Sequence, residues 1–251
     1  MKAAIITVGN EILSGRTVNT NFSDIGKILT YSGYEVIRGI VVPDRLEDIA
    51  GAFREAFSIA DLIISSGGLG PTYDDMTLKG FSMAFNLKMV KNNEALYMIV
   101  KKVHELTPER EKMALIPENS IPLENSAGTA PGVYIEISGK TFIVLPGVPR
   151  EVEAILKEVR DKIRIKGFHY VDKSMDLYNV KESLIAPLIG KLMKEYGNKV
   201  YIKTHPKIDD NGKPWVEIEV SASGTDTDEL ESFVSHILEI IKTDVEKHNY
   251  A

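Results

Sequence analysis

The sequence predicts an α/β fold in which helices cover both faces of a mainly parallel sheet, followed by a small α+β domain. In the first two-thirds of the chain, short runs rich in Ile and Val alternate with segments whose apolar residues recur at helical spacing. Such alternation is typical of parallel sheets with crossover helices. After about Arg164 the order changes to strand, helix, two strands and helix. We therefore expect one domain over residues 1–166 and a second over residues 167–251.

The strands of the first domain are predicted from apolar, often β-branched runs that end in turn residues. The first is Ala3–Val8, which is followed at once by Gly9. The others are expected over residues 35–42, 61–65, 133–137 and 141–145. One helix is expected to begin at a cap on Asp44, because Glu47 follows three residues later, as in a capping box. The remaining helices are expected within residues 17–31, 76–85, 93–105, 108–114 and 151–163.

The second domain is predicted from two helical stripes and a hairpin signal. A strand over residues 170–177 and a helix over 181–196 come first. The hairpin strands 199–204 and 215–222 then flank the turn Asp209-Asp210-Asn211-Gly212. Trp215 in the last strand is expected to be part of the core rather than a stacking platform. A helix over residues 228–246 closes the domain.

Composition excludes several classes of function. The chain has no cysteine, which excludes disulfides, thiolate nucleophiles and cysteine-bound zinc. Its formal net charge of −6 argues against a nucleic-acid partner. No segment approaches the roughly 20 apolar residues that span a bilayer, so no membrane partner is expected. These features predict a cytoplasmic protein.

Glycine-rich loops follow three of the predicted strands. They are VGNE at Val8–Glu11, GGLGPT at Gly67–Thr72 and LPGVP at Leu145–Pro149. Ligands of open parallel sheets bind beyond the carboxyl ends of the strands. The three loops are therefore expected to meet at one cleft.

The loop after the third strand is the strongest of these signals. Its glycines let the backbone approach a ligand closely, and backbone N–H groups near a helix start bind phosphate. Asp74 and Asp75 follow directly. Two carboxylates beside a phosphate repel it unless a cation intervenes, which predicts a Mg²⁺-like ion. The alternative is a tight turn whose aspartates cap a helix.

Four motifs in this order resemble those of the CinA family, in the molybdopterin-binding superfamily. They are VGNEILSG at Val8–Gly15, GGLGPTYDDMT at Gly67–Thr77, NSAGTAPG at Asn125–Gly132 and LPGVPRE at Leu145–Glu151. The resemblance implies a domain that binds a phosphorylated pterin or nucleotide. It also implies metal-dependent hydrolysis of ADP-ribose-like pyrophosphates, and a related domain is linked to FAD hydrolysis. The nicotinamide-nucleotide deamidase domain of longer CinA proteins is not expected here.

Carried over by motif, Asp75 matches the superfamily's functional aspartate, and Asp74 is the additional one of the CinA pattern. We expect Asp75, Asp74 and Glu11 to be catalytic, and Asp75 and Asp74 to hold Mg²⁺, Mn²⁺ or Co²⁺. Glu11 as a plain surface carboxylate is an equal alternative. The residues expected to bind the phosphate or nucleotide are Gly9, Asn10, Ser66, Gly67, Gly68, Gly70, Thr72, Thr77, Gly128, Pro146, Gly147 and Glu151. For Gly128 close packing is an alternative, and for Glu151 an interaction with its helix dipole.

Two functions compete. The first is a metal-dependent hydrolase of nucleotide pyrophosphates such as ADP-ribose or FAD. The alternative is a molybdopterin- or pterin-phosphate-binding protein of molybdenum cofactor metabolism. The second domain resembles a KH-like fold, but it lacks the GXXG clamp of RNA-binding KH domains. We therefore expect it to mediate interaction or dimerisation, and the protein to be a homo-oligomer.

Overall fold

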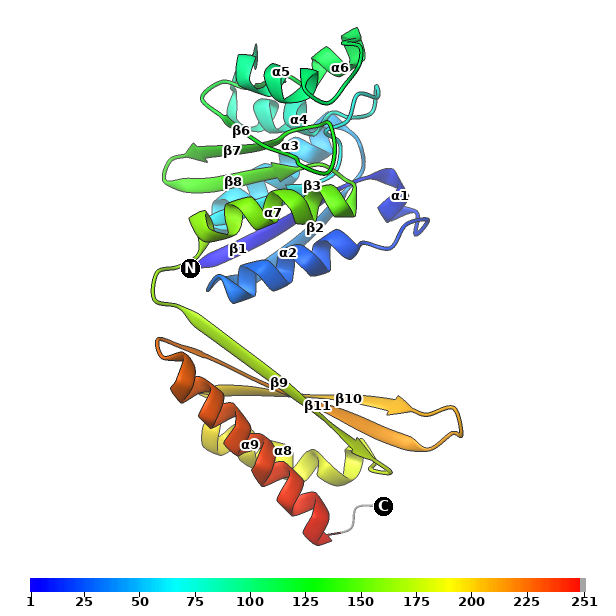
Figure 1. Cartoon of the computed structure of the whole chain (residues 1–251), viewed down its shortest axis with the longest axis vertical. Helices are drawn as coiled ribbons and strands as arrows, with labels where there is room; N and C mark the ends of the chain where they lie inside the picture. Colours follow the sequence, from blue (N-terminus) through cyan, green and yellow to red (C-terminus); the bar gives the residue numbers. More distant parts are fainter. Residues whose placement is uncertain (249–251) are drawn as a thin grey trace. The chain divides into compact units, whose positions relative to one another are not determined.

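The chain forms two compact units in a computed structural model that describes residues 1–248 (Figure 1). The first unit is Met1–Arg164 and the second begins at Ile165, two residues before the expected boundary. No helix formed by residues 1–248 is long and apolar enough to cross a bilayer.

The first unit is built on a six-stranded sheet with the strand order β2-β1-β3-β8-β7-β6. Its parallel strands are β1 (Lys2–Val8), β2 (Glu35–Val42), β3 (Leu62–Ser66) and β8 (Lys140–Leu145). β7 (Gly132–Ile137) pairs antiparallel with β8 on one side and with the edge strand β6 (Ile121–Leu123) on the other. The predicted mainly parallel α/β sheet is therefore confirmed.

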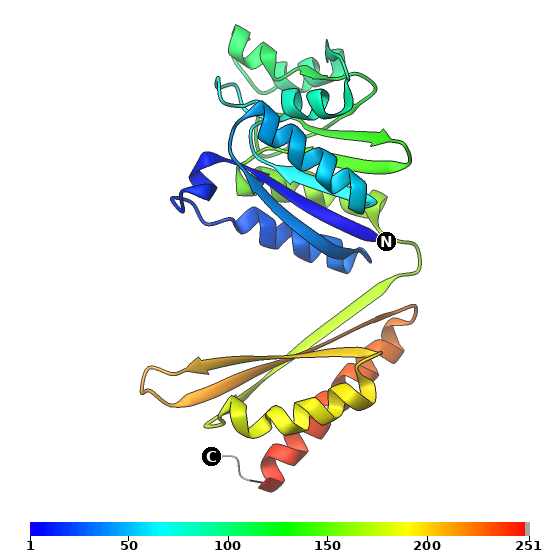
Figure 2. The same cartoon turned by 180° about the vertical axis from the view of Figure 1, so that it is seen from behind.

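Helices cover both faces of the parallel strands (Figures 1 and 2). One face carries α2 (Thr20–Tyr31) and α7 (Pro149–Ile163), and the other carries α3 (Leu46–Ile59) and α4 (Thr77–Phe85). Ile5 of β1 belongs to the first core and Ile6 to the second. Because successive side chains point to opposite faces, a strand buried on both faces needs an unbroken apolar run.

Several short elements lie outside the predicted pattern. They are α1 (Asn10–Leu13), a two-stranded sheet of β4 (Met89–Lys91) and β5 (Leu115–Pro117), and the edge strand β6. The helix expected over residues 93–105 ends earlier, as α5 (Asn93–Val100), and α6 spans Pro108–Lys112. Strands of three residues are too short to show a periodic pattern, which is why the sequence did not reveal them.

The second unit is a three-stranded antiparallel sheet in the order β10-β11-β9. Its strands are β9 (His169–Tyr178), β10 (Val200–Ile208) and β11 (Pro214–Gly224). The helices α8 (Glu182–Tyr196) and α9 (Thr227–His248) pack on one face of this sheet (Figure 2). The small α+β domain is confirmed, and its similarity to a KH fold stays a prediction.

Trp215 lies on the sheet face opposite the helices. Its neighbour Val216 belongs to the core of the unit, so the alternation of the strand turns Trp215 away from that core. The indole instead stacks on Tyr178 with ring centroids 5.6 Å apart, and Lys207 lies over it at 4.5 Å. The expectation that Trp215 is part of the core is therefore wrong.

We expect alanine at Gly80 to destabilise the first unit. A Cβ there would lie 2.5 Å from Cγ2 of Ile49, where α4 packs on α3. The overpacking should lower the free energy of unfolding by about 1–3 kcal/mol. Gly51 in α3 is the control, because a Cβ there meets nothing within 4 Å. Gly51→Ala should raise stability by roughly 0.5–1 kcal/mol. Urea denaturation followed by circular dichroism measures both, and a Gly80→Ala protein as stable as wild type contradicts the packing.

Candidate functional site

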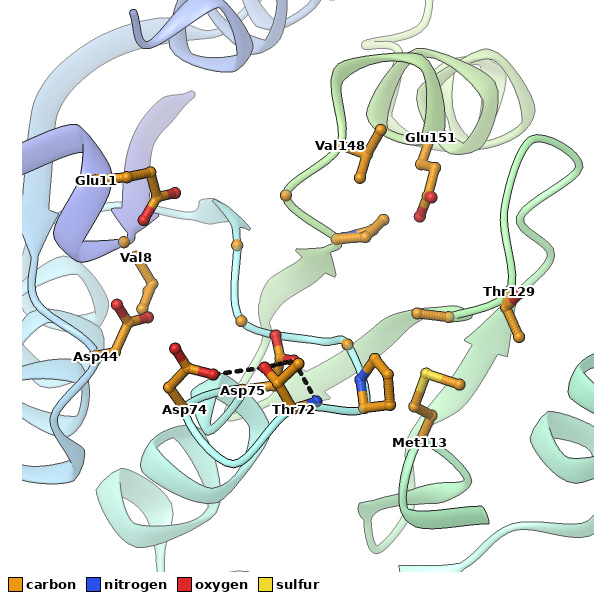
Figure 3. A pocket seen from close by; sticks show the side chains of 18 of the residues that line it. Val8, Glu11, Asp44, Thr72, Asp74, Asp75, Met113, Thr129, Val148 and Glu151 are labelled. Carbon is orange, nitrogen blue, oxygen red and sulfur yellow. Dashed lines mark hydrogen bonds between the residues drawn. The ribbon is translucent and has the colours of Figure 1, made fainter. Parts of the chain in front are cut away.

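A cleft of about 730 Å³ opens at the carboxyl ends of β1, β3 and β8 (Figure 3). The structure brings most of the predicted residues to it: Gly9, Glu11, Gly67, Gly68, Gly70, Thr72, Asp74, Asp75, Pro146, Gly147 and Glu151. Asn10, Ser66, Thr77 and Gly128 are outside its lining. Lining residues that the sequence did not single out include Thr17, Asp44, Arg110, Met113 and Thr129.

Asp44 is the most informative of the missed residues. Its predicted role as a helix cap is wrong, because α3 begins at Leu46 with Arg45 as its N-cap residue. The Asp44 carboxylate instead accepts a hydrogen bond from the backbone N–H of Asn10, at 2.8 Å, and lines the cleft. The position of Asp44 just after β2 could have predicted its place in the cleft. β2 is a parallel strand, so its carboxyl end lies at the same edge of the sheet as those of β1 and β3.

Backbone conformation and backbone packing require glycine at both positions of the diglycine turn. Gly67 and Gly68 have φ angles of 104° and 67°, which favour glycine. A Cβ on Gly67 would lie 2.0 Å from the carbonyl oxygen of Val8. The N–H of Gly67 donates to the carbonyl of Leu145 at 3.0 Å. The N–H of Gly67 is therefore engaged within the protein and is not free for a phosphate.

Thr77 has a similar bracing role. Its hydroxyl is buried and donates to the carbonyl oxygen of Gly67 at 2.7 Å. Its side-chain oxygen would also lie 2.3 Å from a Cβ on Gly68. The hydroxyl thus holds the start of α4 against the diglycine turn. The prediction that it contacts ligand phosphate has no support in this geometry.

Carboxylates of the site lie against glycines. A Cβ on Gly9 would lie 2.5 Å from the Glu11 carboxylate, and one on Gly70 would lie 2.6 Å from that of Asp75. A Cβ on Gly128 would lie 2.2 Å from Oε1 of Glu151. These three glycines leave room for acidic side chains. For Gly128 this contact agrees with the alternative given from the sequence, that its small size permits close packing.

Asp74 and Asp75 converge on Thr72 (Figure 3). The Thr72 hydroxyl oxygen lies 2.5 Å from Oδ1 of Asp74 and 2.6 Å from Oδ2 of Asp75. The backbone N–H of Thr72 also donates to Oδ2 of Asp75 at 2.8 Å. The hydrogen bond from Thr72, and then that from its own backbone N–H, lowers the pKa of Asp74. Asp74 is therefore ionised at neutral pH.

The cleft is strongly acidic. Glu11, Asp44, Asp74, Asp75 and Glu151 line it, whereas Arg110 is the basic residue among the described lining residues. The ammonium of Lys112, beside the cleft, donates to the carbonyl oxygen of Thr72, and burial lowers its pKa. A phosphorylated ligand in this cleft would meet net repulsion unless a cation accompanies it.

Asn125 holds the opposite wall of the cleft. Its Nδ2 atom donates to the carbonyl of Ala130 at 2.8 Å and to Oε2 of Glu151 at 2.9 Å. The ammonium of Lys102 donates to the carbonyls of Asn125 and Gly128. Glu151 therefore lies both in the first turn of α7 and in the cleft, so the two interpretations from the sequence are compatible.

The metal prediction rests on the aspartate pair. Within residues 1–248 there is no group of three or more His, Asp or Glu side chains that could hold a metal ion. Mg²⁺ is commonly bound by one or two carboxylates, with water and substrate phosphates completing its shell. Asp74 and Asp75 supply hard oxygen ligands of this kind, and the bound ion stays a prediction.

We predict that Thr72→Val raises the pKa of Asp74 toward its ordinary value. The hydroxyl stabilises the charged carboxylate, so its contribution to stability is present above the ordinary pKa and is lost as the pH falls through the lowered pKa. A carboxyl-carbon NMR titration of both proteins measures the change. Glu153 is the internal control, because its pKa is lowered by Lys157. An unchanged Asp74 titration in Thr72→Val would contradict the proposed cause.

Comparison with known proteins identifies the family. A family model described as a probable molybdopterin binding domain matches residues 4–164. A protein of Caldivirga maquilingensis is 48% identical over 242 residues, which cover 95% of this chain and 94% of that protein. A protein of Thermoplasma acidophilum is 50% identical over 226 residues, which cover 89% and 88% of the two chains.

A solved structure agrees with these matches. It is the crystal structure of the protein CinA, described as having unknown function, from Thermoplasma acidophilum. It aligns with a TM-score of 0.64 and 54% identity, and the match covers 66% of this chain and 100% of that one. The resemblance to CinA that the four motifs indicate is confirmed. The chain belongs to the family of probable molybdopterin-binding domains, and it is similar to CinA.

Proposed function

We propose that the first unit binds a phosphorylated pterin of the molybdopterin type in the cleft at the carboxyl ends of its parallel strands. The observation that carries the proposal is the family match over residues 4–164, which contains every residue that lines this cleft. The cleft volume of about 730 Å³ also suits a small organic ligand, since such sites commonly measure roughly 300–1,000 Å³.

The charge of the cleft constrains how such a ligand would bind. A phosphate close to Asp74 and Asp75 requires charge compensation, and a divalent ion shared between the two carboxylates and the phosphate supplies it. Thr72 holds the two aspartates with its hydroxyl and its backbone N–H. Such preorganisation reduces the ordering that binding requires. We therefore expect pterin-phosphate binding to depend on Mg²⁺, Mn²⁺ or Co²⁺.

Hydrolysis of nucleotide pyrophosphates such as ADP-ribose or FAD is the second candidate. The observation that favours it is the pair of carboxylates beside the glycine loop, with Glu11 across the same cleft. A divalent ion at such a pair would neutralise the diphosphate and lower the pKa of a bound water. Asp74 and Asp75 would then position the diphosphate, and Glu11 would orient the attacking water. Family membership supports the pterin proposal more directly.

We propose different partners for the two units. A small phosphorylated molecule is the partner that we propose for the first unit. Homo-oligomerisation through the second unit and a cytoplasmic location stay proposals. Light scattering of the purified full chain tests the first of these, because a homo-oligomer would give a multiple of the 27.9 kDa chain mass.

We predict metal-dependent binding of neopterin monophosphate, a fluorescent pterin phosphate, and a loss of that binding in Asp75→Asn. Removing one charge from the metal pair should weaken binding by about tenfold or more, since hydrogen bonds or ligation to charged groups contribute roughly 1.5–3 kcal/mol. Fluorescence titration with each metal and with a chelator measures this. Glu153→Gln is the matched control, because Glu153 is on α7 and outside the cleft lining.

A parallel assay separates the two candidate functions. Product release from ADP-ribose, FAD, NAD and ATP is followed with the same metals. Pterin-phosphate binding without turnover supports the pterin proposal. Metal-dependent cleavage that Asp75→Asn abolishes would move the assignment to the pyrophosphatase. If the folded protein neither binds the pterin phosphate nor cleaves any of these nucleotides, both candidate functions are contradicted.

A further inference from the structure

A smaller chamber of about 60 Å³ adjoins the cleft. The two share the lining residues Val8, Glu11, Thr17, Gly67, Gly147 and Pro149. The wall that belongs to the chamber alone consists largely of hydroxyl and amide side chains: Thr7, Asn19, Thr20, Asn21 and Ser66. Glu11, which is shared with the cleft, is the charged residue of the described lining. The chamber therefore has one carboxylate, whereas the cleft has five.

Two oxygen atoms in this wall lack a hydrogen-bond partner among the described residues. They are Oγ of Ser66 and Oδ1 of Asn21. Both side chains are more than nine-tenths buried, with exposed fractions of 1% and 8%. A buried polar atom that is left unpaired destabilises a protein by roughly 1–3 kcal/mol, so it commonly marks a place for a ligand or water.

The chemistry of Asn21 is fixed by its other contact. Its Nδ2 atom donates to the carbonyl oxygen of Gly147 at 2.8 Å. A rotated amide would place two acceptor oxygens against each other, so the unpaired atom is the acceptor Oδ1. Asn21 therefore needs a hydrogen-bond donor. Ser66 accepts either a donor or an acceptor, because a hydroxyl does both.

Two neighbouring polar side chains, those of Asn19 and Thr7, are already engaged. Nδ2 of Asn19 donates to the hydroxyl oxygen of Thr7 at 3.1 Å, and Oδ1 of Asn19 accepts from the N–H of Phe22 at 3.2 Å. These contacts fasten the start of α2 to β1. Asn21 and Ser66 differ from them because each keeps a free oxygen.

We propose that this chamber takes the pyrimidinone edge of a pterin, while the phosphate of the same ligand lies in the acidic cleft with its cation. The inference rests on the proposed function. The pyrimidinone edge is uncharged and presents N–H and amino donors beside a carbonyl acceptor. It thus matches Oδ1 of Asn21 and the Ser66 hydroxyl. A bare phosphate does not match, because no Lys, Arg or His is among the described residues that line the chamber.

Burial of the two oxygens strengthens the match. Both atoms are almost completely covered by protein and lack a partner among the described residues. A donor that bonds to Asn21 therefore acts in surroundings of low dielectric constant. The chamber should also discriminate against an analogue that has an acceptor in place of the donor, because Oδ1 of Asn21 would then face another oxygen.

Ser65 provides a matched control for Ser66. Its hydroxyl is also buried and unpaired, and it is the adjacent residue of β3. Side chains alternate along the strand: Ile64 packs in the core under α2 and α7, and Ile63 in the core under α3 and α4. Ser66 therefore faces the chamber, and Ser65 faces the opposite core. Alanine at either position removes one buried, unpaired hydroxyl, so both variants should be as stable as wild type or slightly more stable.

The test is fluorescence titration of the full chain with neopterin monophosphate and Mg²⁺, with inorganic pyrophosphate as a second probe by calorimetry. We expect Ser66→Ala to weaken binding of the pterin about tenfold, the usual effect of one buried hydrogen bond, and to leave pyrophosphate binding unchanged. Ser65→Ala should bind both probes like wild type. Thermal unfolding of both variants checks that they fold.

Other outcomes overturn the proposal in distinguishable ways. Equal pterin affinity in Ser66→Ala and Ser65→Ala overturns the subsite and leaves the proposed function standing. Parallel loss of pterin and pyrophosphate affinity in Ser66→Ala places phosphate in the chamber and overturns the assignment of the ring. Failure of wild type to bind the pterin overturns both proposals.

We assign the 2-amino group as the donor to Oδ1 of Asn21. The analogous lumazine phosphate has a carbonyl oxygen at this position but keeps the neighbouring ring N–H, so it tests this orientation. Wild type should bind it at least about tenfold more weakly than the pterin, because two acceptors would face each other. Equal affinity for the two rings would contradict the orientation proposed here.

Discussion

The close approach of Gly67 to the carbonyl oxygen of Val8 is the constraint on which the cleft depends. It brings the loop after β3 against the end of β1, where a Cβ would fall 2.0 Å from that oxygen. The N–H of Gly67 is at the same time bonded to Leu145 at the end of β8. The backbones of three parallel strand ends are thus joined at one residue. Side chains that are far apart in the sequence meet there because these ends are held together.

The two glycine-lined spaces at this junction differ in chemistry. The larger cleft collects carboxylates from the segments that follow β1, β2 and β8 and from the Thr72–Asp75 loop after β3. The smaller chamber collects hydroxyls and amides from the start of α2 and from β1 and β3. Gly67 and Gly147 line both, and a Cβ on Gly147 would lie 3.5 Å from the Cα atom of Gly67. One ligand that is polar at one end and ionic at the other can therefore be held across a narrow glycine boundary.

Much of the architecture could be predicted, because buried parallel strands such as Ala3–Val8 require continuous apolar residues. The meeting of the glycine loops follows from the same topology. The exact partners of each side chain could not be predicted. For Gly128 the sequence left ligand approach and close packing open, and only the structure shows that Glu151 lies against it. Asp44 has a typical capping sequence, yet its carboxylate bonds to Asn10, a contact across 34 residues that no local pattern reveals. The prediction for Trp215 was wrong because the alternation of side chains along a strand does not show which face of the sheet the helices cover.

The shared hydroxyl of Thr72 has a consequence for the symmetry of the aspartate pair. A hydroxyl has one hydrogen, so a full hydrogen bond to Asp74 leaves Asp75 without that donor, and the reverse. Asp75 still accepts from the backbone N–H of Thr72 in either case. Two neighbouring carboxylates of the same type are thereby made chemically unequal by the rotation of a single C–O bond. The distribution of negative charge over the loop can change without any movement of the backbone.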